Sequence, residues 1–181
     1  MRRDSNEDFR VKLDAAGVWE RALAKWARGR GWYVLPTDEF SGKGDGKTPK
    51  LLAPPGRESL IMPDLLGFRE GVSQWLECKW KEKAVEYRIG RYLVTGFNLR
   101  HWRHYQAVET LTRQRVVVAF VHQKERVMRM APLQKLRELV SHTYEGPNMS
   151  SPMVFFRYAE IPVVCSISEL EPSHGSFHAG A

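Results

Sequence analysis

Three residues, Asp64, Glu77 and Lys79, have types and a spacing that could serve chemistry on a charged substrate. Asp64 directly follows Pro63, and Glu77 and Lys79 stand beyond a gap of twelve residues. Because alternate side chains of a strand project from one face, Glu77 and Lys79 would share a face if 72–81 is a strand. A hairpin turn at Glu70-Gly71 would then bring Asp64 toward Glu77. Two carboxylates and one ammonium would converge on a small patch.

Such a patch is suited to a metal-assisted hydrolysis. Two neighbouring carboxylates repel each other unless a cation lies between them, and their hard oxygen atoms suit Mg²⁺ or Mn²⁺. A bound divalent ion lowers the pKa of its water and polarises a phosphoryl oxygen. The Lys79 ammonium could orient the attacking hydroxide or offset charge in the transition state. The alternative is structural: Glu77 and Lys79 form a solvated cross-strand face, and Asp64 only forms a turn.

The elements that must position these residues follow from hydrophobic periodicity. Trp19, Leu23 and Trp26 recur at helical spacing, and 115–122 (RVVVAFVH) is an unbroken apolar run typical of a central strand. Residues 37–58 and about 84–98 are expected to be loops. The expected elements are helices over 13–30, 99–113 and about 132–142, and strands over 32–35, 59–69, 72–81, 115–122 and about 153–158.

This order predicts an α/β (α+β) fold with a mixed β-sheet flanked by helices, in which the central elements run αβββαβ. Residues 1–12 are polar and are predicted to be a flexible N-terminus, and residues 13–160 a single domain. Residues 161–181 are predicted to be a C-terminal extension with a disordered tail.

The spacing of Pro63-Asp64 and Glu77-Cys78-Lys79 resembles the signature of the PD-(D/E)xK nuclease superfamily, which includes restriction-endonuclease-like and Holliday-junction-resolvase-like enzymes. The expected element order over residues 13–122 is similar to the core of that superfamily. The resemblance implies that Asp64 and Glu77 bind a divalent metal together with the backbone carbonyl of Cys78. It also implies a DNA endonuclease whose products carry 5′-phosphate ends.

Many members of this superfamily supply a further glutamate from the first core helix. Glu20 lies at the border of the apolar stripe of the predicted helix, where its carboxylate would lean toward the sheet. The resemblance therefore implies that Glu20 supports the metal, directly or through water, and that Lys79 positions the nucleophile.

The charge of the chain is consistent with a nucleic-acid partner. The formal net charge is +7 and the sequence pI is about 9.6, and Lys and Arg contacts to phosphates release counterions. A merely soluble basic protein is the alternative. Trp102 and Tyr105 are expected in the core, whereas a set of polar residues after the Glu77 strand is expected to contact nucleic acid: Lys81, Lys83, Arg100, Arg103 and Gln106.

Other signals predict no further site. His101 and His104 are interpreted as a pair of surface histidines, because no other His or Cys ligand stands near them. The run Gly42–Thr48 is one residue too short for a phosphate-binding loop of ATPases, so ATP binding is rejected. It is either a flexible basic loop over nucleic acid or an ordinary insertion.

The setting and the partners can be predicted only broadly. The N-terminus lacks the apolar core of a signal peptide, and no apolar run is long enough to span a membrane, which favours a cytoplasmic, or at least intracellular, protein. The expected partner is DNA, with RNA not excluded, and a homodimer is possible. A non-catalytic nucleic-acid-binding or assembly module is the alternative function. By analogy alone, a small nuclease without helicase motifs suits a phage or mobile element.

Overall fold

The structure is a computed structural model that describes residues 6–37, 49–145 and 151–170, without the side chains of 6–16. Its centre is a six-stranded mixed sheet in the order β1-β4-β5-β8-β9-β12. The central strands β5 and β8 run parallel, and all the other neighbouring strands of this sheet are antiparallel. The six strands are β1 (Tyr33–Pro36), β4 (Leu65–Arg69), β5 (Val72–Lys81), β8 (Arg115–His122), β9 (Val127–Pro132) and β12 (Val163–Ser166).

A second sheet of four strands has the order β10-β11-β7-β6, and β2 and β3 form a separate two-stranded ribbon. These strands are β2 (Lys50–Leu51), β3 (Leu60–Ile61), β6 (Val85–Tyr87), β7 (Tyr92–Asn98), β10 (Val140–Tyr144) and β11 (Met153–Arg157). The helices are α1 (Asn6–Arg28), α2 (Leu99–Thr112) and α3 (Leu133–Glu138), with the 3₁₀ turns η2 (Tyr158–Glu160) and η3 (Ile167–Glu169).

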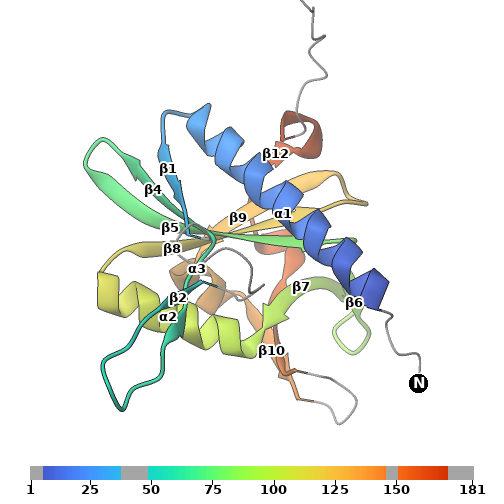
Figure 1. Ribbon diagram of the computed structural model, residues 1–181. Coiled ribbons are helices and arrows are strands. Elements are labelled where there is room, and N and C mark those ends of the chain that lie inside the picture. The colour runs from blue at the N-terminus through green and yellow to red at the C-terminus, as the bar shows by residue number, and fades with distance from the viewer. Residues whose placement is uncertain (1–5, 38–48, 146–150, 171–181) are drawn as a thin grey trace, which may run out of the picture.

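The two faces of the central sheet are covered by different layers. In Figure 1, α1 crosses the front of the sheet, and α2 lies on its other side. Leu76 and Cys78 of β5 belong to the hydrophobic cluster that includes α1 residues, whereas Trp75 belongs to the cluster that includes Trp102 and Tyr105 of α2. The predicted alternation of β5 is therefore confirmed: its odd-numbered residues face α2 and its even-numbered residues face α1.

The predicted fold class and the αβββαβ order are confirmed by α1, β1, β4, β5, α2 and β8. The predictions for β5 and β8 agree with the observed bounds, and α2 ends one residue early. The turn at Glu70-Gly71 is also confirmed: both residues have positive φ, 51° and 77°, as a two-residue hairpin turn requires.

Several predicted boundaries are wrong. Helix α1 begins at Asn6, so residues 6–12 are not a loose terminus; they contain no Gly or Pro that would end a helix. The expected loop over 84–98 holds the β6–β7 hairpin, and the expected helix to about residue 142 ends at Glu138 and is followed by β10. Strand β9 was not predicted.

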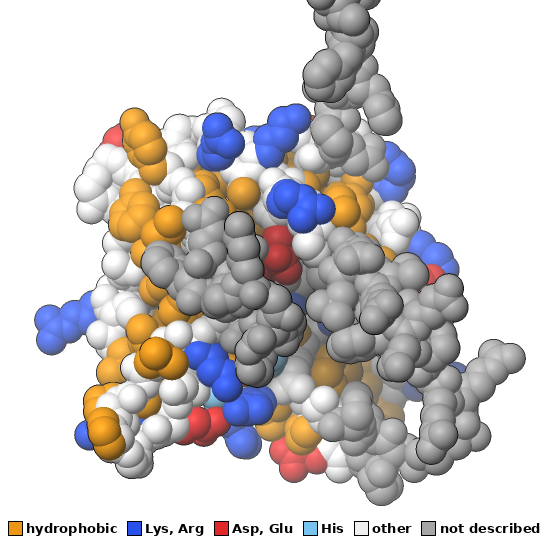
Figure 2. All heavy atoms as spheres, in the orientation of Figure 1, with side chains coloured by type: hydrophobic (Ala, Val, Ile, Leu, Met, Phe, Trp, Pro, Cys, Tyr) orange, Lys and Arg blue, Asp and Glu red, His pale blue; other side chains and the backbone are white. Residues whose placement is uncertain are grey.

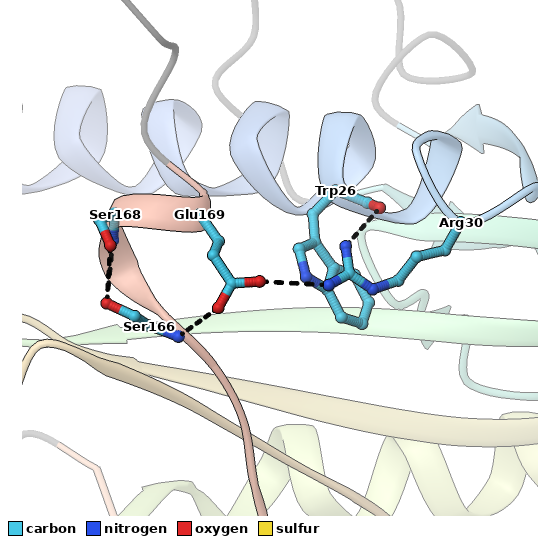
Figure 3. Close-up of polar contacts among 5 residues, drawn as sticks. All are labelled: Trp26, Arg30, Ser166, Ser168 and Glu169. Carbon is cyan, nitrogen blue, oxygen red and sulfur yellow. Dashed lines mark hydrogen bonds and ion pairs between the residues drawn. The ribbon is translucent and has the colours of Figure 1, made fainter.

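Residues 161–170 belong to the domain instead of forming an extension. Strand β12 pairs with β9 at the edge of the central sheet, and Ile167 and Leu170 are buried under α1. Figure 3 shows how this segment meets α1: the Arg30 guanidinium lies 4.0 Å from the centre of the Trp26 ring and is 3.4 Å from Glu169 Oε2. The predicted tail and the Gly42–Thr48 run lie outside the described residues.

Two further features concern the helices and the surface of the described residues. Among the described residues, no helix has both the length and the apolar character needed to cross a membrane. Lys and Arg side chains are spread over several parts of the face in Figure 2 and do not gather in one patch there.

Candidate active site

The β4–β5 hairpin places Asp64 opposite Glu77. Leu65, the first residue of β4, pairs with Leu76 in the antiparallel register, so Asp64 directly before it lies next to Glu77. The backbone amide of Asp64 donates to Glu77 Oε2 at 3.2 Å, and the amide of Cys78 donates to Asp64 Oδ2 at 2.7 Å. The two carboxylates therefore meet on the face of β5 that is turned toward α2.

Glu77 and Lys79 form a buried ion pair on this face. Glu77 is only 1% exposed, and its Oε1 atom contacts Lys79 Nζ. Burial alone would lower the pKa of Lys79, but the charges of Glu77 and Asp64 outweigh burial and raise that pKa. Lys79 is therefore a charged ammonium at neutral pH, and it is fixed beside the carboxylates.

The electrostatic environment disfavours a second negative charge at Asp64. Desolvation raises the pKa of Asp64 well above its usual value, and repulsion by Glu77 raises it further. The Lys79 charge and the Cys78 amide oppose this shift without cancelling it. A cation placed between the two carboxylates would remove the repulsion, so the pair is better suited to a bound cation than to two free charges.

Glu20 approaches from α1 and is half-buried. Its negative charge contributes to the raised pKa of Asp64, which locates the two carboxylates within electrostatic reach of each other. Among the described residues, no group of three His, Cys, Asp or Glu side chains that could hold a metal ion is present. The acidic residues that the geometry brings together are thus Asp64 and Glu77, and Glu20 acts on Asp64 through its charge.

Tyr105 was expected from the sequence only as a core residue. Its ring is buried at 1% exposure, as predicted, but its hydroxyl lies 3.5 Å from Lys79 Nζ and 3.0 Å from His101 Nδ1. Burial raises the pKa of Tyr105 well above its usual value, and Glu77 adds to this shift through charge and a hydrogen bond. The i, i+4 spacing of His101 and Tyr105 was the available signal, because it places both on one side of α2.

The two histidines of α2 are not a surface pair, which corrects the sequence interpretation. His104 is buried, and its Nδ1 accepts a hydrogen bond of 2.8 Å from the Ile61 amide. His101 is half-buried, and burial together with the nearby Lys79 charge lowers its pKa to about 4. A neutral His101 is therefore available to the Tyr105 hydroxyl at neutral pH. The sequence did not reveal this, because it does not show how deeply a given face of a helix is buried.

The residues predicted to contact nucleic acid differ in how they are held. Lys81 continues the Glu77 and Lys79 row of β5, and burial, assisted by Lys79, lowers its pKa to about 8. Arg100 is exposed and pairs with Glu58 at 2.9 Å. Lys83 and Arg103 are exposed and Gln106 is half-buried. Lys81 is thus part of the row beside the carboxylates, and the others lie on surrounding surface.

Comparison with known proteins gives matches only among solved structures. No known protein family and no curated protein matches the chain. A Holliday junction resolvase, Hjc of Archaeoglobus fulgidus, matches with a TM-score of 0.46 and 12% identity, over 78% of this chain and 87% of that one. D212, a nuclease from a fusselovirus, matches with a TM-score of 0.41 and 13% identity, over 94% of this chain and 92% of that one. The function proposed below rests on the residues of the site and not on these two likenesses.

Proposed function

We propose that the chain is a metal-dependent DNA endonuclease that hydrolyses phosphodiester bonds with an activated water. The observation that carries the proposal is the meeting of Asp64, Glu77 and Lys79 on one face of the β4–β5 hairpin. A buried pair of carboxylates with an adjacent ammonium is costly for folding, because each charge must be desolvated. A catalytic role explains why three ionisable groups are gathered there.

The donor atoms fit Mg²⁺ or Mn²⁺. Asp64 and Glu77 would hold the ion, with the carbonyl of Cys78 and with Glu20 directly or through water. Mg²⁺ is commonly bound by one or two carboxylates, and waters and substrate phosphate oxygens complete its shell. The raised pKa of Asp64 supports this assignment, because the site favours a positive partner there. When bound, the ion would supply a water of lowered pKa and polarise the scissile phosphoryl group.

Lys79 is the proposed electrostatic catalyst of the reaction. Its ammonium remains charged, since Glu77 and Asp64 raise its pKa, and it is close to where the attacking oxygen and the phosphoryl oxygens would lie. A fixed charge at that position orients the nucleophile and offsets the charge that develops on phosphorus. The proposed contacts to the nucleic-acid strand are Lys81, Lys83, Arg100, Arg103 and Gln106. Products with 5′-phosphate ends are what the resemblance implies.

The test is cleavage of a panel of supercoiled, linear, flap and junction DNAs, with matching RNAs, in Mg²⁺, Mn²⁺ or EDTA. We expect cleavage only with metal, and a loss of at least about 100-fold in Asp64→Asn, Glu77→Gln and Lys79→Met. Glu138→Gln, which changes an exposed carboxylate on α3, is the matched control and should cleave like the unaltered protein.

Three outcomes would count against the proposal. Cleavage that persists in EDTA would remove the metal from the mechanism, and full activity of Asp64→Asn or Glu77→Gln would move the active site elsewhere. Binding of DNA with no cleavage under any metal would identify a non-catalytic binding module. Preferential cleavage of the RNA panel would change the substrate but retain the chemistry.

A further inference from the structure

The β6–β7 hairpin ends in a tip that exposes an apolar side chain between two cations. Tyr87 pairs with Tyr92, so the tip consists of residues 88–91. Ile89 is 86% exposed, more than any other large hydrophobic side chain described, and Arg88 and Arg91 beside it are exposed as well. Figure 1 shows this hairpin as the light green loop at the lower right. Ile89 thus stands between two cationic side chains at the end of the hairpin.

The tip is held in one conformation by its own backbone and by the strands beneath it. The Arg91 amide donates to the Tyr87 carbonyl at 2.8 Å, and Arg91 has a φ of 54°. A Cβ atom at Gly90 would lie 2.1 Å from the Tyr92 ring, so any larger residue there would force that ring to move. The Tyr92 hydroxyl and Ser141 Oγ are 2.7 Å apart. Ile89 therefore projects from a turn whose conformation is fixed by these contacts.

Aromatic rings continue this support into the second sheet. The Tyr87 ring stacks on His142 with centres 4.2 Å apart, and His142 stacks on Phe155 at 4.9 Å. Strand β7 pairs with β11 over Val94–Asn98, five of its seven residues, so the hairpin is anchored to the second sheet over most of its second strand. A rigid tip loses little conformational entropy when it is inserted into a partner.

The same strand connects the tip to the candidate active site. At the far end of β7, the Phe97 ring lies 5.8 Å from Lys79 Nζ. Six residues separate Arg91 from Phe97, which corresponds to about 20 Å of extended strand. One DNA strand advances about 3.4 Å per base pair, so along a duplex that runs parallel to β7 this length corresponds to roughly six base pairs from the phosphate at Lys79.

We infer that the β6–β7 tip inserts into a groove of double-stranded DNA about six base pairs from the cleaved phosphate. Ile89 contacts the base edges, and Arg88 and Arg91 contact the flanking phosphates. Apolar wedges flanked by cations can open a base step and bend the duplex, at a cost repaid by added contacts. The inference rests on the proposed function for its partner, and it adds a substrate class: duplex flanking the cleavage position.

Binding of the full chain to a 30-base-pair duplex, measured by fluorescence anisotropy with Ca²⁺ in place of Mg²⁺, tests the tip. We expect Ile89→Ser to weaken binding about 5- to 10-fold, and Arg88→Ala to weaken it several-fold and reduce the slope of log K against log salt by about one. Leu111→Ser changes an exposed apolar residue in the last turn of α2, and Arg115→Ala changes the exposed basic residue that begins β8. These two controls should bind like the unaltered protein.

A duplex with 2-aminopurine at successive positions locates the insertion. We expect increased fluorescence near six base pairs from the cut, and loss of this signal in Ile89→Ser. Unchanged affinity in both tip variants would overturn the inference, even if the protein cleaves DNA. Tip-dependent binding without any cleavage would instead retain the inference and contradict the proposed nuclease.

The alternative occupant of the tip is a second copy of the chain. Sedimentation of the unaltered protein and of Ile89→Ser, without DNA, distinguishes the two. A dimer that Ile89→Ser converts to a monomer would assign the tip to self-association and overturn the DNA contact. We expect the same sedimentation for both proteins.

Discussion

Asp64 is hydrogen-bonded across the β4–β5 hairpin both to Glu77 and to the next residue, Cys78. The Asp64 amide donates to the Glu77 carboxylate at 3.2 Å, while the Asp64 carboxylate accepts from the Cys78 amide at 2.7 Å. The backbone at the start of β4 thus fixes the Glu77 side chain, and the backbone of β5 fixes the Asp64 side chain. The separation of the two acidic groups is set by strand pairing and not by loop conformation, which suits a site that must hold an ion.

Removal of the Asp64 charge should stabilise the metal-free protein. Because its pKa is raised in the folded state, Asp64 favours folding most below its usual value of 3.8, and this contribution is lost as pH rises through the folded-state pKa. In EDTA at pH 8, Asp64→Asn should therefore raise Tm by several degrees. Mg²⁺ should raise the Tm of the unaltered protein and have little effect on Asp64→Asn. Equal metal-induced shifts in both proteins would contradict a role for Asp64 in metal binding.

Loss of the lysine alone should be more harmful to folding than loss of the whole ion pair. Lys79→Met leaves the Glu77 carboxylate, which is 1% exposed, without its cation. An unpaired buried charge costs about 3–5 kcal/mol, so Tm in EDTA should fall by about 10 °C. Glu77→Gln combined with Lys79→Met should regain most of this loss but not the cleavage activity. Calorimetry measures the Tm of both variants. A double variant with a Tm as low as that of Lys79→Met would contradict the explanation that the unpaired Glu77 charge destabilises the fold.

The Tyr105 hydroxyl is expected to position Lys79. Tyr105→Phe retains the buried ring but removes the contacts to Lys79 Nζ and His101 Nδ1. We expect kcat to fall about 10-fold with KM nearly unchanged, which corresponds to about 1.4 kcal/mol of transition-state stabilisation. Tyr158→Phe, at another buried tyrosine, is the control. A change confined to KM would instead indicate a contact with the bound nucleic acid.

DNA binding should weaken in the alkaline range because of Lys81. Burial and the neighbouring Lys79 lower its pKa to about 8, so its charge is present at pH 7 and is largely lost at pH 9. Arginine keeps its charge throughout this range. The affinity of Lys81→Arg, measured in Ca²⁺, should therefore change less from pH 7 to 9 than that of the unaltered protein. Identical pH profiles would show that Lys81 does not contact a phosphate.

The last turn of the described chain should contribute strongly to stability. Leu170 is buried under α1, so Leu170→Ala should cost about 2–4 kcal/mol. Glu169→Gln removes only an exposed pair with Arg30 and should cost less than about 1 kcal/mol. Urea unfolding compares the two. Similar losses would show that the contact seen in Figure 3 contributes as much as burial of the leucine.

The parts of the fold that sequence predicted well are those whose neighbours are close in sequence. Strand β5 alternates regularly, β8 is an apolar run, and the turn at Glu70-Gly71 joins β4 to β5 directly. These three features were enough to predict that Asp64 and Glu77 meet, and that Lys79 shares their face.

The parts that were missed depend on partners far along the chain. Residues 94–98 pair with β11, more than fifty residues later along the chain. Strand β12 likewise completes the sheet edge at β9. The Tyr105 hydroxyl was missed for a similar reason: helical periodicity shows which face a residue occupies but not which atom of another strand it reaches.

The even-numbered face of β5 has a separate consequence for the chemical durability of the protein. Both thiols, Cys78 and Cys165, lie in the cluster beneath α1, and burial raises the pKa of each. Oxidants and alkylating reagents react with thiolates, so attack must wait until α1 lifts from the sheet. The lifetime of the protein under oxidising conditions is thus governed by how firmly one helix is docked, on the opposite side from the acidic pair.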